Sequence, residues 1–325
     1  MARHNIPDST DRAEPRRGQM AASARPLPLS LVLSLRPSQW TKNLIIFAAL
    51  IGGQRLLDVG AVLYSIAAFF IFCALSGVVY LVNDVMDREA DRNHPTKRLR
   101  PIASGAVPVG AAITTAVVLS AVALGAAYWL RPEFAFIGVA YLVLLAAYSG
   151  PLKHVVIIDV LTIAIGFVLR AAAGAAVIAV PISHGLLFLT ILLALFLALS
   201  KRRHELVLLA DSATTHRRIL QEYSPYLLDQ MIAVVTASTI VAYAFYTVSP
   251  EIVQKFHTNL LGLTLPFPLY GIFRYLYLVH QKEGGGSPAE MLLTDRPLLV
   301  CVALWAVTVA FIIYGPVHVI RGLIT

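Results

Sequence analysis

Long apolar runs alternate with short polar connections along most of the chain. Their lengths mostly match the roughly 17–25 residues that a helix needs to cross a hydrocarbon core of about 30 Å. We place the runs at residues 31–53, 60–82, 108–130, 133–150, 155–180, 185–200, 228–249, 259–281 and 297–316. Because the runs are continuous rather than alternating, they exclude a transmembrane β-barrel. The pattern predicts an all-α polytopic membrane protein with nine transmembrane helices.

The start of the chain lacks this pattern. Residues 1–27 are polar and rich in arginine, and no apolar run of signal-peptide type follows closely. We therefore expect residues 1–30 to form a disordered cytoplasmic tail and residues 31–325 to form one transmembrane domain.

Composition agrees with a membrane protein and excludes several other classes. Hydrophobic residues make up 58% of the chain and charged residues only 14%, whereas a soluble domain carries about 25% charged residues. Disordered chains are poor in apolar residues, so disorder is excluded for most of the sequence. The two cysteines allow at most one bridge, which excludes a disulfide scaffold.

The net charge of +8 is explained by topology. In a soluble protein such a charge would suggest nucleic acid as a partner. Here most of the 26 Lys and Arg residues, and the longer polar loops, fall on one side of the nine predicted helices. The positive-inside rule assigns that side and the N-terminus to the cytoplasm. We expect a multi-pass protein of the cell membrane and no nucleic-acid partner.

The polar stretch after the second run carries the strongest chemical signal. Asn83, Asp87 and Asp91 follow one another at intervals of four residues, and Asp84 lies among them. On a helix these side chains share one face. Oxygen ligands in such a row suit Mg²⁺, which commonly bridges to substrate phosphates. The alternative is a solvated helix end whose acids are neutralised by nearby arginines.

Three cations follow this acidic stretch within four residues. Lys97, Arg98 and Arg100 stand between Pro95 and Pro101, which make a continuous helix unfavourable. Beside a metal site, such side chains can hold phosphate oxygens, and arginine can do so with two parallel hydrogen bonds. The alternative is an ordinary loop of the positive-inside kind.

Two ionisable residues fall inside apolar runs, where burial is costly and a functional role is the default expectation. Asp159 follows the cytoplasmic edge at Tyr148 to His154, and Arg170 comes eleven residues later. This separation is about 16 Å along a helix, so the two cannot pair directly. The alternatives to a functional role are a buried pair or snorkelling.

Further basic residues lie at membrane edges. Lys201 and Arg202 directly follow the sixth run, and Lys42 stands beside Trp40 in the first. They could close a phosphate pocket from other sides, or serve only as anchors at the membrane surface.

These motifs together resemble those of the UbiA-type intramembrane prenyltransferase superfamily. The signature is the stretch of Asn83, Asp87 and Asp91, followed by the Arg-Pro-x2-Ser-Gly turn at residues 100–105. Further cues are LRPSQWTKN at 35–43, YSGPLKH at 148–154, GFVLRAAAGA at 166–175, LSKRRHEL at 199–206 and LLTDRPLL at 292–299. The resemblance implies nine helices around a central cavity, and it is greatest to the branch that transfers phosphoribose to decaprenyl phosphate.

One departure from the superfamily has chemical content. Aromatic prenyltransferases of this superfamily typically carry a second Asp-x3-Asp motif, but here Asp159 stands alone, Ile163 occupies the place of a second acid, and Lys153 adds a cation. A single Mg²⁺ together with lysines and arginines would suit phosphoribosyl pyrophosphate.

The resemblance implies an enzyme that moves 5-phosphoribose from phosphoribosyl pyrophosphate to a polyprenyl phosphate and releases diphosphate, for synthesis of cell-wall arabinan precursors. The open alternatives are an aromatic polyprenyltransferase acting on a substrate such as 4-hydroxybenzoate and, more remotely, a membrane transporter. A homo-oligomer is compatible with the sequence. The candidate residues are Asn83, Asp87, Asp91 and Lys153 for catalysis, Asn83, Asp84, Asp87 and Asp91 for the metal, and Lys42, Lys97, Arg98, Arg100, Tyr148, Asp159, Arg170, Lys201 and Arg202 for substrate binding.

Overall fold

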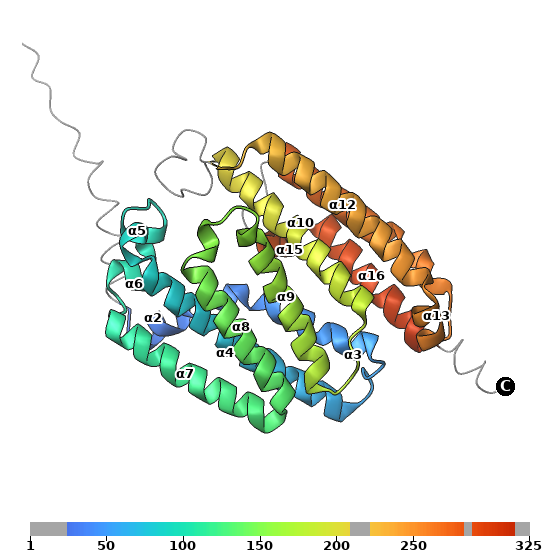
Figure 1. Ribbon diagram of the computed structural model, residues 1–325, viewed down its shortest axis with the longest axis horizontal. Coiled ribbons are helices and arrows are strands. Elements are labelled where there is room, and N and C mark those ends of the chain that lie inside the picture. Colours follow the sequence, from blue (N-terminus) through green and yellow to red (C-terminus); the bar gives the residue numbers. More distant parts are fainter. Residues whose placement is uncertain (1–24, 209–221, 283–287, 316–325) are drawn as a thin grey trace, which may run out of the picture. The chain divides into compact units, whose positions relative to one another are not determined.

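The computed structural model describes residues 25–208, 222–282 and 288–315. Within these ranges the chain forms helices joined by turns and contains no β-strand (Figure 1). The elements in order are α2 Leu27–Ser34, η1 Pro37–Phe47, α3 Ala48–Gly52, α4 Val59–Met86, α5 Arg88–Arg92, η2 Lys97–Leu99, α6 Pro101–Ser104, α7 Val109–Leu130, α8 Pro132–Ser149, η3 Leu152–His154, α9 Ile158–Val177, α10 His184–Leu208, α12 Pro225–Val248, α13 Pro250–Phe256, η5 Leu260–Thr264, α14 Pro266–Gln281, α15 Pro288–Thr294 and α16 Arg296–Tyr314. The predicted all-α class is confirmed.

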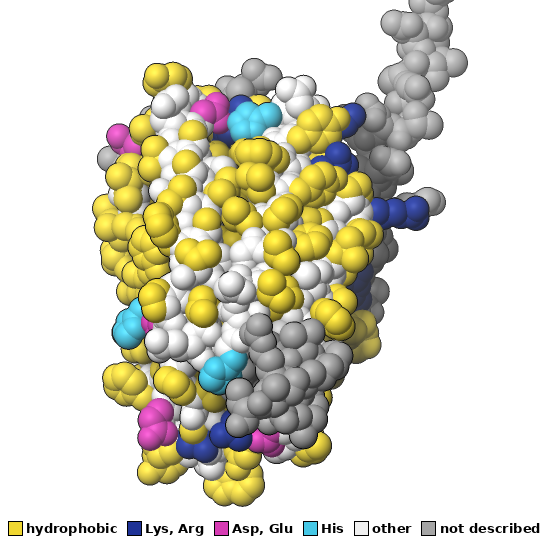
Figure 2. All heavy atoms as spheres, turned by 90° about the vertical axis from the view of Figure 1, so that its right-hand side faces the viewer, with side chains coloured by type: hydrophobic (Ala, Val, Ile, Leu, Met, Phe, Trp, Pro, Cys, Tyr) yellow, Lys and Arg dark blue, Asp and Glu magenta, His cyan; other side chains and the backbone are white. Residues whose placement is uncertain are grey.

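Seven helices of the described residues are long and apolar enough to cross a membrane. They are Val59–Met86, Val109–Leu130, Pro132–Ser149, Ile158–Val177, His184–Val207, Pro225–Val248 and Arg296–Tyr314. On the face drawn in Figure 2, hydrophobic side chains predominate and charged side chains lie mainly toward its ends and edges. These features confirm a polytopic membrane protein.

The predicted number of nine spans is not confirmed, because two of the nine segments are divided between shorter elements. In 31–53, α2 ends before Arg36, whose φ is 52°, and Pro37 then begins a 3₁₀-helix. In 259–281, η5 gives way to α14 at Pro266. Proline lacks the backbone N–H that would continue a helix, so both breaks have a local cause.

The predicted boundary at residue 30 falls inside a helix. Residues 1–24 lie outside the described part of the chain, and α2 already begins at Leu27. The last residues assigned to a disordered tail are therefore helical.

Several helices begin where the sequence supplies a cap. Ser224 Oγ accepts a hydrogen bond from Leu227 N at 3.1 Å at the start of α12. Asp295 Oδ1 accepts one from Leu298 N at 2.9 Å at the start of α16. Such side chains satisfy backbone donors that the first helical turn leaves unpaired. Both helices also have a proline in the first turn, where no N–H is needed.

The described residues form two compact units. Unit 1 contains the described part of Met1–Ser38 together with Cys73–Ala123, and unit 2 contains Gln39–Phe72 together with the described part of Leu124–Thr325. In unit 1, α6 packs against α2 and α5. In unit 2, α10 packs against α9 and α12, α8 against α9, and α14 against α16.

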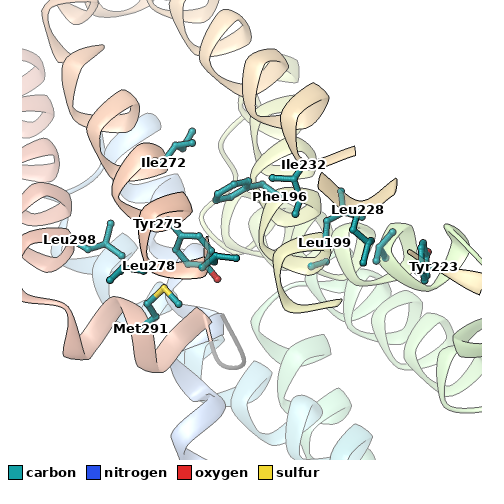
Figure 3. Close-up of a cluster of buried hydrophobic side chains, with 13 residues drawn as sticks. Phe196, Leu199, Tyr223, Leu228, Ile232, Ile272, Tyr275, Leu278, Met291 and Leu298 are labelled. Carbon is teal, nitrogen blue, oxygen red and sulfur yellow. The ribbon is translucent and has the colours of Figure 1, made fainter. Parts of the chain in front are cut away.

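The larger core of unit 2 joins α10, α12, α14 and α16. Its fully buried side chains include Phe196, Leu199 and Leu228, and Figure 3 shows the cluster. The rings of Phe196 and Tyr275 meet edge to face with centres 5.2 Å apart. Tyr223, which precedes α12, belongs to the same cluster. This core therefore holds the C-terminal part of α10, which carries Arg202, and the residue Tyr223 before α12.

Candidate functional site: an acidic helix end and a buried polar network

The end of α4 carries the acidic motif of unit 1. Backbone hydrogen bonds run from Asp87 N to Asn83 O (2.9 Å) and from Asp91 N to Asp87 O (2.8 Å), so helical spacing continues from α4 into α5. Residues four apart in a helix share one face, and Asn83 Nδ2 donates to Asp87 Oδ2 at 3.1 Å. The predicted alignment of these three residues is confirmed.

Two arginines neutralise the buried acids of this motif. Asp84 and Asp91 are only 2% and 4% exposed. Asp84 Oδ1 accepts hydrogen bonds from Arg36 Nη2 at 2.5 Å and from Arg100 Nη1 at 3.1 Å. The same nitrogen of Arg100 donates to Asp91 Oδ2 at 2.5 Å. A buried carboxylate is costly unless a cation pairs with it, which explains why two arginines converge here.

Arg36 is a partner that sequence reasoning missed. Its guanidinium carbon lies 4.7 Å from the centre of the Tyr80 ring. Beside it, an added Cβ on Gly77 would lie 2.8 Å from Leu35 Cδ2, so the chain passes close to α4. Gly77, Tyr80 and Asp84 thus lie along the side of α4 that meets the chain around Arg36. The sequence did offer one signal, because Arg36 stands directly before Pro37 just as Arg100 stands directly before Pro101.

The basic turn after α5 separates the predicted phosphate-binding residues. Arg100 is directed to the acids, as described above, whereas Arg98 is exposed and Lys97 is half-buried in η2. Arg92 Nε donates to Ala103 O at 3.1 Å and ties α5 to α6 across the turn. The turn therefore keeps a compact backbone while Arg98 faces solvent.

The acidic motif contains oxygen atoms of the kind that Mg²⁺ prefers as ligands. No group of three or more His, Cys, Asp and Glu side chains in the described ranges is arranged to hold a metal ion. The donor chemistry nevertheless fits Mg²⁺, because Asn83, Asp87 and Asp91 supply amide and carboxylate oxygens on one helical face. Both buried acids are also bonded to arginines, Asp84 Oδ1 to Arg36 and Arg100, and Asp91 Oδ2 to Arg100.

Unit 2 contains a second aspartate–arginine grouping, and this one is fully buried. The side chains of Asp159 and Arg202 are 0% and 3% exposed and are joined by Arg202 Nε donating to Asp159 Oδ2 at 2.7 Å. Arg202 also donates to Glu205 Oε2 at 2.6 Å and to Tyr148 Oη at 3.2 Å. Tyr223 Oη donates to Asp159 Oδ1 at 3.0 Å. Both oxygens of Asp159 are therefore bonded within the protein.

The two lysines predicted near this network have different surroundings. Lys153 lies in η3 and is 9% exposed. The Lys201 side chain is 44% exposed, and its Nζ lies 3.8 Å from Glu205 Oε1. Neighbouring residues of a helix do not face the same way, so Lys201 remains at the surface while Arg202 is buried.

Arg170 is buried in α9 and binds neutral acceptors. Its Nε donates to Asn43 Oδ1 at 2.7 Å, Nη2 to Tyr141 Oη at 2.6 Å and Nη1 to Gly166 O at 3.1 Å. Its guanidinium also lies 4.8 Å from the centre of the Tyr141 ring, within the range of a cation–π contact. Asp159 and Arg170 thus have different partners, as their spacing predicted.

The segment that carries Lys42 lies directly against α9. An added Cβ on Gly174 would overlap the backbone of Ile46, so only glycine allows this approach. Lys42 is half-buried in the same 3₁₀-helix, η1. Beside it, Trp40 Nε1 and Thr41 Oγ1 are buried and have no hydrogen-bond partner among the described residues. Buried polar groups in folded proteins almost always have a hydrogen-bond partner. We therefore expect Trp40 Nε1 and Thr41 Oγ1 to bond to a polar group other than the described residues.

The fold and these motifs agree with a known family. The sequence matches the UbiA prenyltransferase family over residues 44–294, which is most of the chain. The chain belongs to the UbiA prenyltransferase family. The resemblance drawn from the acidic stretch and the Arg-Pro turn is therefore confirmed.

Relatives within the family carry a more specific name. A decaprenyl-phosphate phosphoribosyltransferase from Mycobacterium tuberculosis is 33% identical over 290 residues, which cover 87% of this chain and 94% of the relative. One of the same name from Corynebacterium glutamicum is 32% identical over 294 residues, covering 87% of this chain and 86% of the relative. These similarities confirm the prediction of an enzyme of the transferase class.

A solved UbiA structure shares the fold. The UbiA homologue from Archaeoglobus fulgidus bound to GPP and Mg²⁺ superposes with a TM-score of 0.67 at 17% identity, covering 87% of this chain and 99% of that one. At this identity the likeness establishes the fold and leaves the reaction to other arguments.

Tyr223, Tyr141 and Asn43 also escaped prediction. Each bonds to a charged residue that the sequence did single out. Tyr223 and Tyr141 belong to no charged or spaced motif, and Asn43 ends the stretch LRPSQWTKN at 35–43, in which no role was assigned to it. A single polar side chain inside or beside an apolar run carries no periodic signal, so only the fold reveals such partners.

Proposed function

We propose that the protein transfers 5-phosphoribose from phosphoribosyl pyrophosphate to a polyprenyl phosphate and releases diphosphate. One observation carries the choice among family reactions. Both oxygens of Asp159 are bonded to Arg202 and Tyr223, and Ile163 stands where a second acid would be. A second all-carboxylate metal site of the aromatic prenyltransferase kind is therefore disfavoured. The names of the relatives at about a third identity support the same choice.

The metal requirement is part of this proposal. Asn83, Asp87 and Asp91 would hold one Mg²⁺, and a related fold was solved with Mg²⁺ bound. Bound there, the ion would supply positive charge that stabilises the leaving diphosphate.

The chain's own cations would hold the remaining phosphate charge. We assign this role to Lys97, Arg98, Lys153, Lys201 and Lys42. We assign the guanidiniums of Arg100, Arg170 and Arg202 to positioning, because their hydrogen bonds go to protein acceptors. We assign the same positioning role to Asp84, Asp159 and Tyr148. Asp84 accepts a hydrogen bond from Arg100, and Asp159 and Tyr148 accept hydrogen bonds from Arg202.

The nucleophile needs little help from a base. A polyprenyl phosphate is already anionic, so its oxygen attacks C1 of the ribose without losing a proton. Positive charge develops on C1 and the ring oxygen as the bond to diphosphate breaks, and attack from the opposite face inverts the configuration. The lipid product would serve as a precursor of cell-wall arabinan.

The second candidate is an aromatic polyprenyltransferase. The related structure bound to GPP, a prenyl diphosphate, favours it. The first acidic motif does not separate the two reactions, because both expel diphosphate. The family match gives no support to the transporter alternative.

We further propose that the N-terminus and the basic loops face the cytoplasm, following the positive-inside rule. Cys73 and Cys301 are both buried, so an Arg98→Cys variant offers a new exposed thiol. A membrane-impermeant thiol reagent should label it from the cytoplasmic side alone. Labelling from the outer side alone would reverse the orientation.

A reconstitution assay tests the proposed reaction. The purified protein in liposomes is incubated with Mg²⁺, labelled phosphoribosyl pyrophosphate and polyprenyl phosphate, and the lipid fraction is counted. We expect a labelled lipid that requires all three components. Prenylation of 4-hydroxybenzoate from a polyprenyl diphosphate, with no labelled lipid, would replace this proposal by the second candidate.

A further inference from the structure

Ile157 has a backbone conformation that its side chain disfavours. It lies between η3 and α9 with φ of 69° and ψ of −43°. Positive φ is a genuine outlier for a β-branched residue, and such conformations persist only where the surroundings enforce them. The Ile157 side chain is 47% exposed, so its own packing supplies little of that enforcement.

The hydroxyl of Tyr223 supplies the missing restraint. Ile157 N donates to Tyr223 Oη at 2.7 Å, and the same hydroxyl donates its proton to Asp159 Oδ1 at 3.0 Å. Asp159 is held in turn by Arg202 through its other oxygen. One oxygen atom thus fixes the residue before α9 and a side chain of its first turn.

Tyr223 is well placed for this task. It is 4% exposed, and its ring belongs to the core cluster drawn in Figure 3, so the hydroxyl has little freedom. Burial, and to a lesser extent the Asp159 carboxylate, raise the pKa of Tyr223 to about 12. The hydroxyl therefore keeps its proton and remains a donor at physiological pH.

The restraint extends from Ile157 to the turn that carries Lys153. Val155 N donates to Leu152 O at 3.2 Å, and Asp159 N donates to Val155 O at 3.1 Å. These two bonds connect the start of α9 to η3, the short helix in which Lys153 is buried. A change at Ile157 therefore alters the direction in which this turn leaves α9.

We propose that Tyr223 is a positioning residue that holds Lys153 in place by restraining Ile157 and Asp159. This inference rests on the proposed function in one respect, namely that Lys153 binds a phosphate of the substrate. Tyr223 acts only through these neighbours and touches no reacting atom.

The structure offers a matched pair of variants. Tyr223→Phe removes only the hydroxyl that bonds to Ile157 and Asp159. Tyr275→Phe removes a hydroxyl from the same core cluster, and that hydroxyl is buried without a hydrogen-bond partner among the described residues. A purely structural loss would appear in the amount of folded protein, whereas a positioning loss appears in substrate binding and in the environment of Lys153.

We expect Tyr223→Phe to raise the KM for phosphoribosyl pyrophosphate by roughly tenfold or more, with a much smaller change in kcat for the folded fraction. Tyr275→Phe should leave both constants unchanged. Adding Ile157→Gly to Tyr223→Phe should recover part of the lost affinity, because glycine adopts positive φ without strain. Equal KM values for wild type and Tyr223→Phe would overturn the proposal.

A second readout does not depend on the reaction. Modification of Lys153 by an amine-reactive reagent, followed by mass spectrometry, should be faster in Tyr223→Phe and unchanged in Tyr275→Phe. Identical Lys153 labelling in wild type and Tyr223→Phe would refute the positioning role. If the wild type transfers no phosphoribose while labelling still responds, the proposed function fails and the positioning of Lys153 stands.

Discussion

The Asp84 grouping of unit 1 and the Asp159 grouping of unit 2 both pair aspartate with arginine, but they differ in how deeply the arginines are buried. In unit 1, Asp84 is 2% exposed, but its partners Arg36 and Arg100 are 25% and 26% exposed. In unit 2, Asp159 and Arg202 are 0% and 3% exposed. Water therefore reaches the cations of the first grouping and is excluded from both charges of the second.

This difference in solvent exposure suggests different roles for the two groupings, ligand binding for the one in unit 1 and structural support for the one in unit 2. A partly exposed guanidinium is screened by solvent, so each of its bonds contributes less than one made by a buried guanidinium. A buried charge that loses its partner has no solvent to replace it. We therefore infer that the acidic end of α4 is suited to binding ions and phosphates, and that the Asp159 network holds local geometry.

Removal of Arg202 should have the largest effect on stability. Arg202→Met leaves Asp159 and Glu205 without their shared cation, and we expect a loss of about 3–5 kcal/mol in the free energy of unfolding. Thermal unfolding in detergent measures it. Lys201→Met is the control, because this exposed neighbour should change stability little. Equal melting temperatures for Arg202→Met and Lys201→Met would mean that the buried Arg202 stabilises the fold no more than an exposed cation does. The distinction between the buried and the partly exposed grouping would then be lost.

Removal of Arg36 should cost less. Arg36→Met deprives Asp84 of one hydrogen bond from a charged group, while Arg100 remains bonded to the same oxygen. We expect a loss of about 1.5–3 kcal/mol, measured by the same unfolding experiment. Arg98→Met, at an exposed position of the basic turn, serves as its control. A loss as large as that of Arg202→Met would show that solvent exposure does not weaken the first grouping.

The Asp295–Arg274 pair provides the smallest expected effect. The hydrogen bond from Arg274, together with that from Leu298 N, lowers the pKa of Asp295 below its usual value. A carboxyl with a lowered folded pKa stabilises the protein above its unfolded pKa of about 3.9, and this contribution is lost as pH falls through the folded value. Asp295→Asn should therefore melt slightly below wild type at pH 7.

The difference between Asp295→Asn and wild type should shrink as the pH is lowered past about 4. Melting temperatures recorded across this range check the sign. A difference that grows on acidification would mean that the ion pair does not stabilise α16.

The fold was predictable where the local signal was strong. Uniformly apolar runs such as the one after Val59 became continuous helices. The first segment is divided into shorter elements because Arg36 adopts positive φ and Pro37 interrupts the backbone pattern, effects that hydropathy alone does not show. The segment 259–281 is divided at Pro266 for a related reason.

The candidate site was predictable only in its local part. The i, i+4 spacing of Asn83 and Asp87 is a property of one helix, and the structure reproduces it. The partners of Arg202 and Arg170 lie 43 and 127 residues away in sequence. Such contacts depend on how helices pack, so the sequence singled out Arg202 and Arg170 without revealing their partners.

A side-by-side comparison of Asp87→Asn and Asp159→Asn tests the central claim most directly. In thermal unfolding, Asp87→Asn should melt like wild type. In the labelled-lipid assay with Mg²⁺, the same variant should lose at least about a hundredfold in turnover. Asp159→Asn should melt at a clearly lower temperature, with turnover of the folded fraction reduced far less. Full turnover in Asp87→Asn, or unchanged melting with lost turnover in Asp159→Asn, would contradict the assignment of binding to one grouping and scaffolding to the other.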